Sequence, residues 1–71
     1  MGHTVREWNT GVVKFFNESK GYGFIKDDES DMEYFFHFTK AIDKVTKNQK
    51  VAFELENGKR GMTAVNVKRV K

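Results

Sequence analysis

The clearest alternation of apolar and polar residues lies at residues 49–56, where Val51, Phe53 and Leu55 occupy every second position between mostly polar neighbours. Successive side chains of a strand point to opposite faces, so this spacing places all three on one side of an extended chain. The segment therefore predicts a β-strand with one face in a core.

Shorter segments of the same kind predict four more strands, at residues 10–17, 20–25, 34–38 and 62–70. No stretch keeps the helical period of about 3.6 residues long enough for a packed helix, and residues 39–48 allow a helical turn at most. Asn57-Gly58 predicts a hairpin turn, extended by residues 59–61, because both residues tolerate positive φ angles. Five strands with one small core predict an all-β barrel that is closed or nearly closed, since closure leaves no exposed edge strand.

A chain of 71 residues is expected to form one domain with a single small core. We expect Ile42 and Val45 to anchor residues 39–48 to that core. The apolar residues expected to fill it are Val12, Val13, Ile25, Ile42, Val51, Phe53, Leu55, Val65 and Val67.

Two aromatic runs, KGYGFI at residues 20–25 and YFFHF at residues 34–38, flank an acidic connector. If the runs pair as an antiparallel hairpin, alternation gathers rings from both runs on one face. Aromatic side chains in strands usually belong to a core. Packing rings on both faces would need a second buried layer, however, which so short a chain cannot supply. The hairpin therefore predicts an aromatic face open to solvent or ligand, made of Tyr22, Phe24, Phe35 and His37, with Lys20 and Phe38 at its ends.

Such a face has the chemistry that single-stranded nucleic acid requires, because unstacked bases stack on flat rings and lysines contact phosphates. The formal net charge is +3, and five of the ten acidic residues lie between residues 27 and 33. The rest of the chain holds 13 basic residues and five acidic ones. We favour a solvated loop for residues 26–32 over a calcium site, because the EF-hand spacing is absent. The remaining surface is then basic and suits a polyanionic partner.

The strand at residues 10–17 leaves the direction of its two phenylalanines open. Strict alternation points Val13 inward, places Phe16 outward with Lys14, and turns Phe15 inward. A bulge at the strand end would reverse the two rings.

Residues 1–9 show neither strand nor helix period and are expected to form a disordered tail, which leaves residues 10–71 as the nucleic-acid-binding domain. Trp8 in this tail could pack on the end of the barrel, contact a ligand or lie in solvent. The sequence has no cysteine, no apolar run long enough to span a membrane and no visible secretory signal. These features predict a cytoplasmic protein.

Three segments, TGVVKFFN at residues 10–17, KGYGFI at residues 20–25 and FFHF at residues 35–38, resemble the cold-shock domain. The second and third look like the two ribonucleoprotein motifs of that family, and GMTAVNV at residues 61–67 is similar to its closing strand. The resemblance covers residues 10–70. It implies a five-stranded antiparallel OB-fold-like barrel that binds single-stranded RNA and DNA. It also implies an ATP-independent RNA chaperone that takes part in the cold-shock response or in transcription or translation regulation.

The resemblance also implies the binding residues. It favours an outward Phe15, with Phe16 as the weaker candidate, and it makes Arg60 a peripheral basic contact. The remaining binding positions that it implies are Lys14, Lys20, Tyr22, Phe24, Phe35, His37 and Phe38.

This chain departs from the family pattern at four places. Phe15 stands where a tryptophan is common and Tyr22 where a phenylalanine is common, and each keeps a ring on which a base can stack. Met62 replaces a usual proline. The loop at residues 43–48 is shorter than usual and lacks an aromatic residue, which predicts binding weaker by about one stacked base, roughly 1–3 kcal/mol.

A protein-interaction module is the alternative function, because OB-like barrels host several functions. An enzyme is the least favoured class, since His37 has no nucleophile or orienting acid at a predictable spacing. A metal site formed by His3 and His37 would lack further ligands. We therefore expect no catalytic activity, metal, cofactor, small-molecule substrate or membrane partner. We expect a monomer that binds single-stranded RNA and DNA.

Overall fold

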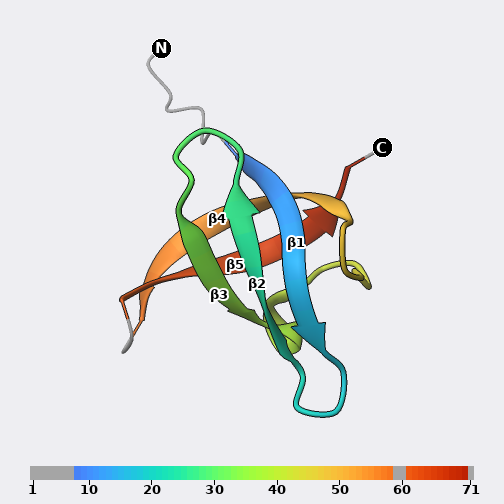
Figure 1. Cartoon of the computed structure of the whole chain (residues 1–71). Helices are drawn as coiled ribbons and strands as arrows, with labels where there is room; N and C mark the ends of the chain where they lie inside the picture. Colours follow the sequence, from blue (N-terminus) through green and yellow to red (C-terminus); the bar gives the residue numbers. More distant parts are fainter. Residues whose placement is uncertain (1–7, 59–60, 71) are drawn as a thin grey trace.

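Five strands close into one barrel in the computed structural model, which describes residues 8–58 and 61–70 (Figure 1). The strands are β1 (Asn9–Asn17), β2 (Tyr22–Asp27), β3 (Glu33–His37), β4 (Lys50–Gly58) and β5 (Gly61–Arg69). A single 3-10 turn, η1 (Phe38–Lys40), follows β3. The strand order around the barrel is β1-β2-β3-β5-β4, and the predicted all-β barrel is confirmed. No helix among the described residues is long and apolar enough to cross a membrane.

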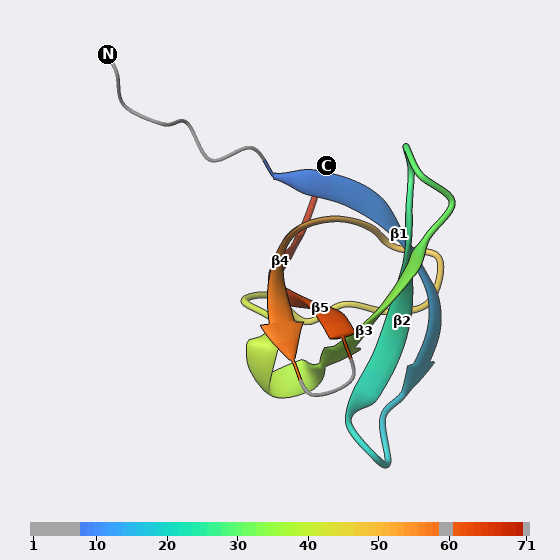
Figure 2. The same ribbon diagram turned by 90° about the vertical axis from the view of Figure 1, so that its left-hand side faces the viewer.

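Four of the five strand pairs are antiparallel, and the pair β3–β5 that completes the barrel is parallel. Strands β1, β2 and β3 lie side by side, and β4 and β5 cross behind them (Figures 1 and 2). The β1–β2 turn and the acidic β2–β3 connector lie at opposite ends of this front sheet (Figure 1). The two connections therefore place their side chains in different regions of the molecule.

The core matches most of the expected apolar positions. Phe53 and Val45 are buried in it, and Leu55 packs against it. Phe36, which was not among the expected core residues, is also fully buried. Val12 is only half-buried. Ile42 is 61% exposed, so its predicted anchoring role is wrong. The reason is local: Ala41 bridges to Val67 and packs against the core, so the next side chain of the extended segment points outward. The other fully buried large residues are Val13, Ile25, Val51 and Val67.

A β-bulge in β1 decides the direction of the two phenylalanines. Val13 pairs with Ile25, but Phe15 rather than Lys14 pairs with Phe24, so β1 contains one extra residue. Such an insertion breaks the alternation of faces. Lys14 and Phe15 are both exposed, and the Phe16 ring stacks on buried Phe36 with centroids 5.9 Å apart and planes 7° apart. Strict alternation was therefore wrong at this end of β1.

The first strand of the hairpin between β4 and β5 continues two residues further than expected. Strand β4 continues through Asn57 and Gly58, where Asn57 pairs with Met62 and Gly58 pairs with Gly61. Residues 59 and 60, between these two strands in the sequence, lie outside the described residues. Gly61 has a φ of 103°, a conformation that favours glycine. The prediction that Asn57-Gly58 forms the turn is therefore wrong.

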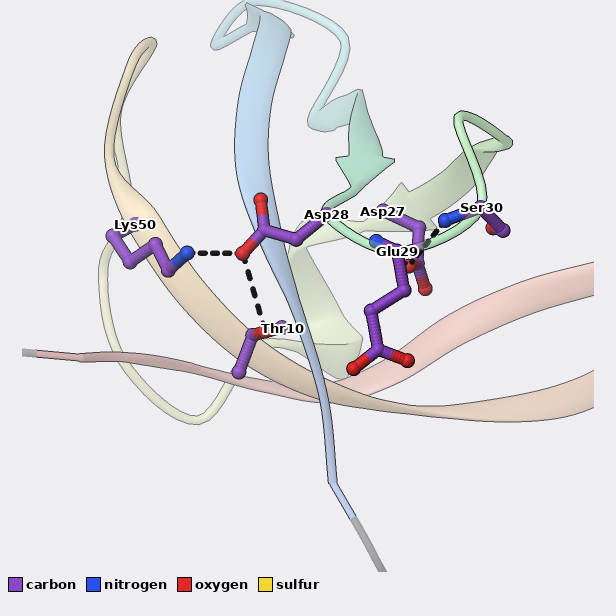
Figure 3. Close-up of polar contacts among 6 residues, drawn as sticks. All are labelled: Thr10, Asp27, Asp28, Glu29, Ser30 and Lys50. Carbon is purple, nitrogen blue, oxygen red and sulfur yellow. Dashed lines mark hydrogen bonds and ion pairs between the residues drawn. The ribbon is translucent and has the colours of Figure 1, made fainter.

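Hydrogen bonds within the acidic connector hold its shape, which a loop that is only solvated would lack (Figure 3). Asp27 is only 4% exposed. Its Oδ1 accepts hydrogen bonds from the backbone N–H groups of Glu29 at 2.7 Å and Ser30 at 3.2 Å. Its Oδ2 accepts one from the Asn9 side-chain amide at 3.1 Å. The prediction of a solvated loop therefore fails at Asp27, because a buried carboxylate with three donors closes the turn.

The neighbouring Asp28 ties the connector to two other strands (Figure 3). Its carboxylate accepts hydrogen bonds from the Thr10 hydroxyl of β1 at 3.2 Å and from the Lys50 ammonium of β4. The Lys50 hydrogen bond holds the pKa of Asp28 below its ordinary value, against an opposing effect of desolvation. Together, Asp27 and Asp28 form what we call the carboxylate latch.

Trp8 is the first described residue and lies against the outside of the barrel. The Lys68 Nζ of β5 sits 4.3 Å from the centroid of its ring, an arrangement typical of a cation–π contact. The side chain remains 38% exposed. Of the three alternatives left open by the sequence, packing against the barrel describes Trp8 best. The rest of the expected disordered tail, residues 1–7, lies outside the described residues, and Asn9 already belongs to β1.

Candidate nucleic-acid interface

The pairing of β2 with β3 brings four rings onto one face of the front sheet. Tyr22 pairs with His37 and Phe24 pairs with Phe35, so these side chains share a face by alternation. The Tyr22 and Phe35 rings stack with centroids 5.6 Å apart, and the Phe24 and Phe35 rings meet edge to face at 5.9 Å. The intervening residues of β2, Gly23 and Ile25, are buried.

The bulge in β1 adds a fifth ring to this face. The Phe15 centroid lies 5.9 Å from that of Tyr22 and 6.3 Å from that of Phe24. Phe15 is 42% exposed, so part of its side chain is accessible to a ligand. Gly23 permits this close approach of β1 and β2, since a Cβ atom there would lie 2.3 Å from the Phe15 carbonyl oxygen. The structure therefore places Phe15, and not Phe16, with the predicted aromatic residues.

Phe38 provides a sixth ring beyond the end of β3. Its centroid lies 5.1 Å from that of His37, and its side chain is 54% exposed. The ring is seated on Gly21, where a Cβ atom would lie 2.4 Å from Phe38 Cδ1. The Phe38 N–H donates to the Gly21 carbonyl at 2.8 Å. Gly21, with a φ of 73°, is therefore a positioning residue whose role the sequence alone did not reveal.

The His37 ring is held by Thr39, the middle residue of η1. Its Nδ1 accepts a hydrogen bond from the Thr39 N–H at 3.3 Å and lies 2.9 Å from the Thr39 hydroxyl. These contacts fix the orientation of the imidazole beside its neighbours. We use the name aromatic platform for the six rings that share this surface: Phe15, Tyr22, Phe24, Phe35, His37 and Phe38.

A groove of about 380 Å³ runs over the centre of the platform, and Lys20 forms part of its lining together with Tyr22, Phe24, Phe35 and His37. Lys14 and Lys20 are both exposed, and neither forms an ion pair within the part of the chain that the structure describes. Both ammonium groups are thus available to an anionic ligand. Arg60, the third predicted basic contact, lies outside the described residues.

One basic residue near the platform was not singled out from the sequence. Lys47, in the segment between η1 and β4, borders a groove that Phe15 and Thr46 also line. The sequence shows the lysine, but it does not show that this irregular segment returns to the end of β1. The backbone N–H of Asn48 donates to the Val13 carbonyl at 2.7 Å, which holds the segment there.

The strand order and the exposed aromatic sheet define a small barrel of the OB type. Residues 9–70 match the family described as the 'Cold-shock' DNA-binding domain, and the chain belongs to this cold-shock domain family. Nucleic-acid binding and a general role in the cold-shock response follow from that membership.

Curated relatives agree with this assignment. The Cold shock-like protein CspG of Escherichia coli (strain K12) is 48% identical over 63 residues, an alignment covering 82% of this chain and 89% of the relative. The Cold shock-like protein CspE of the same organism is 43% identical over 61 residues, covering 80% and 88%. The Cold shock-like protein CspA of Shewanella violacea is 43% identical over 63 residues, covering 83% and 90%.

A solved structure is also similar. The structure titled drosophila Unr CSD456 superposes with a TM-score of 0.78 at 25% sequence identity. The match covers 93% of this chain and 28% of the solved chain, so the barrel corresponds to a part of that longer protein.

Proposed function

We propose that this protein binds single-stranded RNA and DNA by stacking bases on the aromatic platform while Lys14, Lys20 and Arg60 contact phosphates. The observation that carries the proposal is the geometry of six rings on one face with centroid separations of 5.1–6.3 Å between neighbours. Every base has a face on which a ring can stack, so binding tolerates many sequences. In a duplex these faces are hidden, so single strands are preferred.

The same contacts support an ATP-independent RNA chaperone. Bases held on protein rings cannot pair with one another, and a ligand that binds only the open form shifts a hairpin toward opening. No nucleotide hydrolysis is needed for this shift. We accordingly infer a monomeric binding protein of the cytoplasm that acts without a catalytic step or cofactor.

The experiment that tests this function is a titration of a fluorescein-labelled, pyrimidine-rich single strand of about seven nucleotides, followed by anisotropy. The matched duplex and a Phe24→Ala/Phe35→Ala variant run in parallel. Trp8→Ala is the control, because it removes an exposed ring that lies outside the platform. We expect the wild type and the control to bind the single strand more tightly than the duplex, and the double variant to lose most of this affinity.

Salt dependence separates this function from a protein-interaction module. Three phosphate contacts predict a slope of roughly −2 in a plot of log affinity against log salt concentration, from about −0.7 per contact on single strands. An apolar protein interface would show almost no slope. If the wild type fails to bind the single strand at low salt, the aromatic platform is a binding surface for a protein partner instead.

A further inference from the structure

A third and larger groove begins on the other side of Phe38. Its volume is about 560 Å³, and it lies between the β1–β2 turn and residues 41–45. Aromatic and aliphatic residues provide most of its lining, and those with exposed surface include Phe16, Phe38 and Ile42. The volume falls within the range of about 300–1,000 Å³ that is typical of sites for small organic ligands. Of the residues that line this groove, only Phe38 takes part in the function proposed above.

Phe38 joins the groove to the aromatic platform. One contact of its ring is with His37 of the platform, and the same residue lines the groove together with Gly21. Since Gly21 fixes the Phe38 ring, the boundary between the two sites is well defined. A nucleic-acid strand that reaches Phe38 along the platform therefore has its next nucleotide at the mouth of the groove.

The polar groups at the rim decide which base would fit. Glu18, Asp43 and Lys44 are the charged residues among those that line it. The Asp43 carboxylate already accepts a hydrogen bond from the Arg69 N–H at 3.1 Å. Within residues 8–58 and 61–70, neither Glu18 nor Lys44 has a hydrogen bond or ion pair through its side chain. The Lys44 ammonium suits a phosphate, and the Glu18 carboxylate can only accept hydrogen bonds and so needs a donor.

We propose that this groove binds one unstacked base of the same strand and that Glu18 makes it prefer guanine. Guanine carries adjacent N1–H and N2–H donors, which can bind both oxygens of one carboxylate. Uracil and thymine present one N–H between two carbonyl groups, and those carbonyls repel a carboxylate. Glu18 is thus a specificity-determining residue. The inference rests on the proposed function, because the platform delivers the strand to the groove.

The test adds one nucleotide to either end of an oligothymidine of about seven nucleotides and measures affinity by anisotropy. The added nucleotide is guanine, thymine or an abasic residue. For the wild type, we expect guanine at one of the two ends to lower the Kd at least about fivefold relative to thymine, the lower limit for a good bidentate contact to a base. In Glu18→Ala the ratio of the two Kd values should fall to about one. Glu29→Ala, which removes an exposed acid of the distant connector, should keep the wild-type ratio.

A second measurement locates the added base. In two-dimensional amide NMR spectra, the guanine extension should shift the signals of Ile42 and Val45, and the abasic extension, which lacks the base, should leave them in place. Equal affinity for guanine and thymine at both ends would overturn the inference, as would a guanine preference that survives Glu18→Ala or shifts confined to the platform. If even the unextended oligothymidine fails to bind, the proposed function itself is wrong. If it binds and guanine adds nothing, only the groove assignment is lost.

Discussion

The aromatic platform and the carboxylate latch lie at different ends of the front sheet. Both reverse the usual rule that apolar side chains are buried and charged ones exposed. At the platform, large rings such as Phe15 and Phe38 are exposed. At the latch, the carboxylate of Asp27 is buried. The Asp27 carboxylate accepts hydrogen bonds from within the molecule, whereas Phe15 and Phe38 of the platform are 42% and 54% exposed. A small barrel can thus give the acids of this connector structural roles and keep them away from the platform that meets an anionic ligand.

The comparison predicts that the platform serves binding more than folding. Phe24→Ala/Phe35→Ala should weaken binding of a single strand by about 2–6 kcal/mol, since each stacked base contributes roughly 1–3 kcal/mol. The loss in free energy of unfolding should be smaller, because both rings are partly exposed. Anisotropy titration and urea denaturation of the same variant measure the two quantities. A larger loss of stability than of binding would make these rings core residues.

Gly21→Ala should reduce both single-strand binding and stability through the single Cβ atom that it adds. The new Cβ would collide with the Phe38 ring, and the positive φ angle adds strain of roughly 1–2 kcal/mol. We expect the unfolding free energy to fall by the amount of this strain. We also expect the free energy of binding to weaken by about 1–3 kcal/mol, equal to one stacked base.

Gly61→Ala is the matched control for this change. Gly61 also has a positive φ angle, but a Cβ atom there meets nothing within 4 Å. This variant should lose stability and keep its affinity for the single strand. If both variants bind as tightly as the wild type, Phe38 does not belong to the binding surface.

At the latch, Asp27→Ala should reduce stability and leave binding nearly unchanged. It would leave three donors without their acceptor in a buried position, which typically costs about 1–3 kcal/mol of unfolding free energy. Urea denaturation measures this loss, and Glu29→Ala, which removes an exposed acid from the same connector, should show almost none. Reduced affinity in folded Asp27→Ala would show that the two regions are coupled.

The smallest expected effect concerns pH and Asp28. Because the folded state lowers the pKa of this carboxyl, the contact contributes its full stability above the ordinary pKa of about 3.9 and loses it as the pH falls through the lowered value. As the pH falls from about 5 to 3, the wild type should lose unfolding free energy because this contact is lost. Asp28→Asn should therefore lose less unfolding free energy over the same range. An unchanged pH profile would mean that the exposed Lys50 contact adds no measurable stability.

Much of the fold follows from local patterns, and the exceptions have physical causes. The strand at residues 49–56 and the aromatic hairpin were predicted because alternation depends only on neighbouring residues. Lys14 in the bulge breaks that alternation, and its position depends on how β1 registers with β2. The resemblance to the cold-shock domain favoured the outward Phe15, which spacing alone could not decide.

The latch and the third groove depend on contacts between distant segments. Asp27 is buried because Asn9 of β1 and the following turn supply its donors. An acidic run in the sequence gives no sign of that partner. Likewise, residues 41–45 form a wall of the groove because Ala41 bridges to Val67, a contact across 26 positions of the chain. Short-range patterns contain no information about such pairings.

The parallel pair β3–β5 closes the barrel with only two residue pairs, Phe35 with Thr63 and Phe36 with Ala64. This seam is much shorter than the antiparallel seams, so we expect local opening of the barrel to begin there. Phe35 belongs both to the seam and to the platform. A nucleic-acid strand stacked on Phe35 would therefore slow hydrogen exchange along β3 and β5. The bound ligand would hold closed the shortest strand pair of the barrel.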